Sequence, residues 1–184
     1  MFRKSTSKAP GEIIVSLVSV ALLIALQVVL SRFLSIQLWN LKIGFSFVPV
    51  IIAARLFGPL YSVMVYGVGD IIGTFLFPTG PYFPGFTFTA VVSGLIFGLL
   101  LYKKSTPVKI ISASVLNQLI CSLLLNTFWI SYTAGVPFWG QLSVRWPQSL
   151  GMCAVQIILM LVGLEKICAP IEKIITKNVR SNRK

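Results

Sequence analysis

The sequence predicts an all-α integral membrane protein built as a bundle of six helices. Of its 184 residues, 56% are hydrophobic and only 11% are charged, whereas a soluble domain has about 45–50% apolar residues. Its mean hydropathy is +0.89. A helix needs about 20 mainly apolar residues to cross a membrane, and short loops divide the chain into about six apolar stretches. We expect one membrane domain over residues 1–184, with basic cytoplasmic tails at 1–11 and 170–184.

The first helix is predicted over Glu12–Phe33. A basic segment precedes it, as in a signal peptide, but the apolar stretch is too long and lacks a convincing cleavage site, so we interpret it as a retained helix. The second helix, Phe45–Phe57, would be only about 20 Å long and contains Pro49, so it is short for a membrane span. The other four are expected from the break at 57–59 to about Phe77, and over Thr87–Tyr102, Val108–Tyr132 and Pro147–Cys168.

The basic residues assign the two sides of the membrane. If six helices alternate, most Lys and Arg residues fall on one side, which satisfies the positive-inside rule for a bacterial cytoplasmic membrane protein with both termini in the cytoplasm. Topology therefore explains the net charge of +12 without a nucleic-acid partner. Three aromatic loops with little charge are left on the outer side, and we interpret them as a lid and rim over an outward-opening site. They are "LWNLKIGF", "FPTGPYFPGF" and "TAGVPFWGQLSVRWP".

Asp70 stands out among the four acidic residues because it lies inside a predicted membrane helix. The other three lie near cytoplasmic helix ends. A carboxylate in the middle of a membrane helix costs about 2.5–3.5 kcal/mol on insertion scales, so we expect Asp70 to face the bundle or a wet cavity. The alternative is a packing role, in which Asp70 pairs with Arg32, Arg55 or a helix backbone.

The composition argues against an enzyme. The chain has no histidine, which excludes an HExxH zinc site and a Ser-His-Asp triad, and it has no Walker A sequence with which to use ATP. Its three cysteines are odd in number and lack motif spacing, so we interpret them as buried small residues and expect no metal and no cofactor. The classes of function that remain are ligand binding, passage of a solute across the membrane, and scaffolding.

The predicted outer half of the bundle carries polar and aromatic residues suited to a ligand. Asn126 and Trp129 are three residues apart on the fifth helix and would share a face. Tryptophan is, however, common at membrane interfaces in proteins that bind no ligand there. Together with Asp70, these groups suit a flat heteroaromatic ligand with a carboxylate tail. The remaining candidates are three aromatic residues and two bases of the outer side: Tyr82, Phe83, Phe86, Arg145 and Lys42.

The stretch from Gly44 to Tyr102, together with "LLNTFWISY" and "RWPQSL", resembles the folate-family (FolT-type) S components of energy-coupling factor (ECF) vitamin transporters. The aspartate in a glycine-flanked helix and the loop "PTGPYFPGF" are the most specific elements of the resemblance. It implies a six-helix S-component fold and high-affinity capture of folate from outside. It also implies docking onto a transmembrane coupling protein with two ATPases, and toppling in the membrane with the first and third outer loops as gates.

The resemblance also implies a docking motif in the first helix. Members of this family carry an AxxxA motif that packs on the coupling protein, and this chain has "ALLIA" with Ala21 and Ala25. Small residues four apart permit close helix approach in any membrane protein, so packing within the chain is the alternative.

Two other functions stay open from the sequence. The chain could be an S component for another heteroaromatic vitamin or precursor, such as a pyrimidine. It could also be a membrane scaffold that transports nothing, although a scaffold would not need an acid, an amide and aromatic rings converging on one outer cavity.

Overall fold

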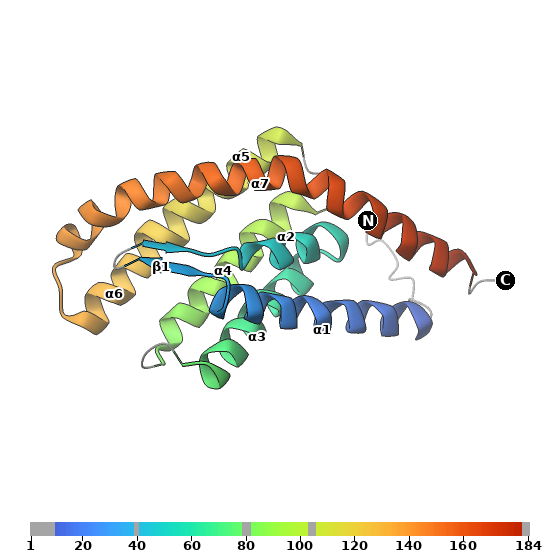
Figure 1. Cartoon of the computed structure of the whole chain (residues 1–184), viewed down its shortest axis with the longest axis horizontal. Helices are drawn as coiled ribbons and strands as arrows, with labels where there is room; N and C mark the ends of the chain where they lie inside the picture. Colours follow the sequence, from blue (N-terminus) through green and yellow to red (C-terminus); the bar gives the residue numbers. More distant parts are fainter. Residues whose placement is uncertain (1–9, 39–40, 79–81, 103–105, 182–184) are drawn as a thin grey trace, which may run out of the picture.

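The computed structural model describes residues 10–38, 41–78, 82–102 and 106–181 and is almost entirely helical in these ranges. Figure 1 shows the helices packed as an elongated bundle, with the long helix α7 running along one side of it. The elements are α1 (Pro10–Arg32), β1 (Ile36–Leu38), β2 (Leu41–Ile43), α2 (Phe47–Leu56), α3 (Pro59–Leu76), α4 (Pro84–Leu101), α5 (Pro107–Leu116), the π-helix η1 (Asn117–Asn126), α6 (Thr127–Ala134) and α7 (Phe138–Ser181).

The predicted six-helix membrane fold is confirmed. The helices α5, η1 and α6 follow one another without a break and form one span over Pro107–Ala134. In the described part of the chain, five helices are long and apolar enough to cross a membrane. The sixth helix is α2, which has only 10 residues, as its proline and its short apolar stretch indicated.

The start of the last helix was predicted wrongly. Its beginning was expected at about Pro147, but α7 starts at Phe138. Inside a membrane bundle a proline is tolerated within a helix because neighbouring groups satisfy the freed carbonyl. The expected third outer loop is therefore mostly helix, and only 135–137 connect α6 to α7. At its other end α7 continues through Ser181, so 170–181 is helical, as are residues 10 and 11 of the expected N-terminal tail.

The first outer loop contains a β-hairpin that the sequence did not predict. Strand β1 pairs antiparallel with β2, with Ile36 opposite Ile43 and Gln37 opposite Lys42. Pairing satisfies backbone groups that would otherwise be exposed near lipid. In the view of Figure 1 the hairpin lies between α1 and α7, near the turn from α6 to α7. We call this end of the bundle, with the hairpin and the α3–α4 and α6–α7 connections, the loop end.

The half of the bundle away from the loop end is filled with apolar side chains. Its core draws on α1, α2, α3, α4, α5 and α7 and includes the fully buried Val50, Val65, Phe97, Leu101, Ala113 and Met160. Helices α3 and α4 approach closely here, because Gly94 and Gly98 of α4 face Ser62 and Pro59 of α3. The Ser62 hydroxyl donates a hydrogen bond of 2.8 Å to the Gly94 carbonyl. Small residues four apart thus let two helices of this chain touch.

A methyl group at Gly94 should therefore destabilise the protein. In Gly94→Ala the new Cβ would lie 2.8 Å from the Ser62 carbonyl oxygen and 2.9 Å from the Val63 Cα, and relieving such overpacking costs about 1–3 kcal/mol. We expect a lower thermal unfolding midpoint for the purified protein in detergent. The control is Gly151→Ala, where the Cβ meets nothing within 4 Å. Equal midpoints for the two variants would contradict the close α3–α4 contact.

Candidate functional site

A cavity of about 940 Å³ occupies the loop-end half of the bundle. This volume lies in the range of small-molecule sites, which is about 300–1,000 Å³. Its walls come from the loop-end halves of α1, α3, α4, η1 and α7, with contributions from the start of α2 and from α6. In each long span, one end therefore lines the cavity, and the other end packs in the apolar core or lies at the surface.

The floor of the cavity is the boundary with this core. In α4, Ser93 lines the cavity and Phe97, one turn further, is fully buried in the core. In α7, Gln156 lines the cavity and Met160 lies in the core one turn later. In α3, Tyr66 lines the cavity directly after the core residue Val65. Polar residues thus stop where tight apolar packing begins, and the cavity lies on the loop-end side of this boundary.

The π-helix η1 gathers polar residues on the cavity wall. In an α-helix of 3.6 residues per turn, Asn117 and Asn126 would lie roughly 180° apart. A π-helix makes i→i+5 hydrogen bonds and has more residues per turn, so residues four and five apart align. The Thr127 hydroxyl follows this spacing and donates to the Ser122 carbonyl at 3.4 Å. As a result, one face of η1 presents Asn117, Gln118, Cys121, Ser122 and Asn126 to the cavity.

Asp70 lies on the cavity wall, half-buried, and is tied into α4. The Thr87 hydroxyl donates to Asp70 Oδ2 at 2.9 Å. On the next turn of α3, the Thr74 hydroxyl donates to the Asp70 carbonyl oxygen at 2.8 Å and accepts from Arg32 Nη2 at 2.7 Å. The carboxylate is thus positioned by neighbours on α1, α3 and α4 and faces the cavity, not lipid.

Two glycines beside Asp70 make room for polar side chains of α1. A Cβ at Gly69 would collide with the amide group of Gln27, and a Cβ at Gly73 would lie 3.0 Å from Arg32 Nε. Both Gln27 and Arg32 line the cavity. The glycines around Asp70 in the sequence therefore serve to seat two side chains of α1 in the wall.

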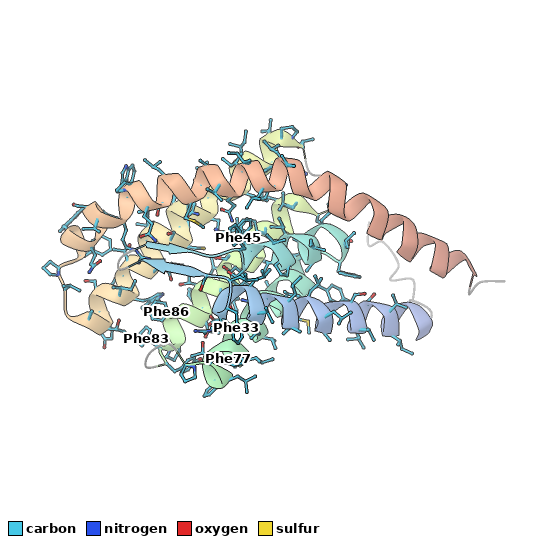
Figure 2. The ribbon with its side chains drawn as sticks, viewed as in Figure 1. Phe33, Phe45, Phe77, Phe83 and Phe86 are labelled. Carbon is cyan, nitrogen blue, oxygen red and sulfur yellow. The ribbon has the colours of Figure 1, made fainter. Side chains whose placement is uncertain are left out.

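The aromatic residues form a cluster at the mouth of the cavity. Tyr82, Phe83 and Phe86 line it, and Figure 2 shows Phe83 and Phe86 close together at the loop end. The ring of Phe83 lies 5.4 Å from that of Trp129 and 5.9 Å from that of Tyr132. Trp129 packs over Gly85, and its indole N–H donates to the Thr89 hydroxyl at 3.1 Å. Among the described lining residues Trp129 is absent, so it supports the wall through Phe83 and Thr89.

The structure describes the side chain of only one of the two predicted basic residues. Arg145 of α7 lines the cavity, and its Nη1 atom is buried without a hydrogen-bond partner. Lys42 lies in β2, opposite Gln37, and its side chain is outside the described part. The structure therefore brings six of the eight expected ligand residues together around one cavity: Asp70, Asn126, Arg145, Tyr82, Phe83 and Phe86.

Sequence reasoning missed three carboxamides. The side-chain oxygens of Gln27, Asn117 and Gln156 are buried without a hydrogen-bond partner, and all three residues line the cavity. A buried polar group left unpaired costs about 1–3 kcal/mol. Their signal in the sequence is an amide inside each of three apolar helices, where a buried polar group needs a partner.

Comparisons with known proteins agree with this geometry. The family model described as "ECF transporter, substrate-specific component" matches residues 15–174. "Folate transporter FolT" of Clostridium novyi (strain NT) is 38% identical over 121 residues, which are 65% of this chain and 70% of that protein. "Folate transporter FolT" of Leuconostoc mesenteroides is 37% identical over 115 residues, 61% of this chain and 62% of that one. A solved structure, "Crystal structure of FolT bound with folic acid", superposes with a TM-score of 0.75 at 33% identity, covering 79% of this chain and 90% of that chain.

The indole hydrogen bond predicts a structural role for Trp129. In Trp129→Phe the Thr89 hydroxyl loses its donor and the smaller ring leaves space over Gly85, so we expect a loss of about 1–3 kcal/mol of stability. Trp139→Phe is the matched control because Trp139 is 76% exposed. Thermal unfolding of both purified variants measures the difference. A Trp129→Phe protein as stable as the control would contradict the support that we assign to this ring.

Proposed function

The chain belongs to the family of ECF transporter substrate-specific components, and from this premise we propose that its cavity captures folate from outside the cell. The family consists of transport subunits, not enzymes, and the chain is a multi-pass membrane protein. The observation that carries the proposal is the 940 Å³ cavity, with Asp70 in its wall, in a chain 33% identical to a FolT solved with folic acid. A scaffold would have no use for such a cavity, and another heteroaromatic vitamin is an outcome that ligand titration distinguishes.

Asp70 is the proposed acceptor for the pterin end of folate. A pterin ring has a ring N–H next to an exocyclic amine, and a carboxylate can accept from both. Charge-assisted pairs of this kind are roughly twice as strong as neutral hydrogen bonds. The position of Asp70 on the cavity wall, held by the hydrogen bond from Thr87, supports this role.

The other expected residues complete the proposed site. Asn126 fixes the edge of the ring, and Phe83, supported by Trp129, offers an aromatic face for stacking. Arg145, whose Nη1 atom has no hydrogen-bond partner, meets the glutamate carboxylates of folate, together with Lys42 of the hairpin. The aromatic cluster at the mouth, with Tyr82 and Phe86, covers the ligand.

The proposed partner surface is the exposed side of α1. Ala21 and Ala25 are both exposed, and Leu22 beside them is 67% exposed, so a helix of another protein can approach this face closely. We assign it to the transmembrane coupling protein of an ECF importer, with two ATPase subunits that supply the energy. The distribution of basic residues supports cytoplasmic termini, which puts the loop end and its cavity on the outside.

The ligand contacts can be separated by two folate analogues. Asp70→Asn leaves the pterin donors without a charged acceptor, so it should weaken folic acid and pteroic acid alike, by roughly tenfold to several hundredfold. Arg145→Ala and Lys42→Ala should weaken folic acid but discriminate less between folic acid and pteroic acid, which lacks the glutamate. Equilibrium titration at matched protein stability measures these ratios. An unchanged affinity of Asp70→Asn for folic acid would contradict the role of Asp70 as pterin acceptor and would favour a packing role instead.

The docking face can be separated from the ligand site. In Ala21→Trp and Ala25→Trp a bulky ring prevents close helix approach, so complex formation with the coupling protein and folate uptake should be lost while folate affinity is kept. Ala154→Trp is the control because Ala154 is also exposed, on α7. Co-purification, uptake and binding are measured on the same variants. Parallel loss of folate affinity and uptake would indicate a folding defect instead of a docking role.

A further inference from the structure

Three carboxamide side chains that line the cavity have oxygens without a hydrogen-bond partner in the described part of the chain. Gln27 is 1% exposed and Gln156 is 2% exposed, and the side-chain oxygens of both, with that of Asn117, lack a hydrogen-bond partner. All three line the same cavity although they come from three helices, α1, η1 and α7. Buried polar groups in proteins are almost always hydrogen-bonded, so three unpaired carboxamide oxygens around one cavity indicate a binding site.

Asn117 and Gln156 lie at the same depth of the cavity. Two hydrogen bonds between the fifth span and α7 show that these helices run antiparallel and fix their register. The bonds join Ser122 to Ser149 at 3.1 Å and Ser114 to Met160 at 3.4 Å. Asn117 is three residues after Ser114, and Gln156 is four residues before Met160, so both are about one turn above the core. Their amide groups therefore belong to one patch of wall at the floor.

Gln27 belongs to a different wall, beside Asp70. Helix α1 packs on α2 and α3, whereas α7 packs on η1, α5, α6 and α2, and Figure 1 shows α1 and α7 on different sides of the bundle. The amide of Gln27 is seated against Gly69, the residue before Asp70. A flat ring that begins at Asp70 and reaches toward the floor would therefore meet carboxamides from both walls.

We infer that Gln27, Asn117 and Gln156 form a neutral recognition site for the edge of the fused ring that Asp70 does not cover. This inference rests on the proposed function. A carboxamide offers both an N–H donor and a carbonyl acceptor, so it complements a ring edge that carries ring nitrogens and a carbonyl. It carries no charge, so it can stay buried in a membrane protein when the cavity is empty at far lower cost than an ion.

The same chemistry assigns the tail of the ligand to the cationic residues of the cavity. A carboxylate needs a cationic partner or several N–H donors when it is buried, and the guanidinium groups of Arg32 and Arg145 line the cavity. We therefore expect the three carboxamides to bind the ring of the ligand, and Arg32 and Arg145 to bind its carboxylate tail.

The experiment replaces amides by apolar groups of similar size. Gln27→Met and Gln156→Met are compared with the wild type and with Gln141→Met, a control on α7 at a residue that is not among those lining the cavity. The probes are folic acid, pteroic acid, 6-hydroxymethylpterin, which has the ring without the tail, and p-aminobenzoylglutamate, which has the tail without the ring. Affinity and ligand-free thermal stability are measured for each variant.

Gln27→Met and Gln156→Met should each bind the three ring-bearing probes about tenfold more weakly. Their affinity for p-aminobenzoylglutamate should not change, and the control variant should bind all four probes like the wild type. The ligand-free midpoint should stay the same or rise, because an unpaired buried amide has been removed. A merely structural role would lower it. Wild-type affinity for 6-hydroxymethylpterin in both variants, or equal losses for p-aminobenzoylglutamate, would overturn this inference alone. A wild type that binds no folic acid would overturn the proposed function and this inference with it.

Discussion

The structure depends on one constraint, which is that polar groups inside a membrane must find partners within the protein or in a ligand. The bundle satisfies this constraint because its two halves differ in the side chains that they bury. The half away from the loop end is a close-packed apolar core in which Gly94 and Gly98 bring α3 against α4. The other half keeps a cavity of about 940 Å³, and the side-chain oxygens of Gln27, Asn117 and Gln156 in its wall have no hydrogen-bond partner in the described part of the chain.

Local backbone features decide which side chains line this cavity. The π-helix puts four polar residues of one span and Cys121 on the cavity wall, and Gly69 and Gly73 leave room for Gln27 and Arg32 beside Asp70. Neither feature adds a functional group of its own. Both decide which side chains share the cavity, so its lining depends on helix geometry as much as on residue type.

The sequence predicted the parts of this account that follow from composition and from single unusual residues. Apolar stretches located the spans, and a carboxylate in a membrane helix located the site, because Asp70 lines the cavity. Features that depend on backbone geometry were missed. Pro147 was taken as a helix start although it lies within α7, and the hairpin has no turn signature among apolar neighbours. Asn126 and Trp129 were expected to face the ligand together, whereas Asn126 lines the cavity and Trp129 packs against Phe83 and Gly85.

Equilibrium titration of the purified wild-type protein with a panel of vitamins tests the central claim most directly. The account predicts saturable binding of one folic acid per chain, in competition with pteroic acid, and no comparable binding of riboflavin, thiamine or biotin. Preferential binding of another heteroaromatic vitamin would keep the family and contradict the assigned ligand. A protein that is folded and binds none of them would contradict the claim that this cavity is a vitamin site.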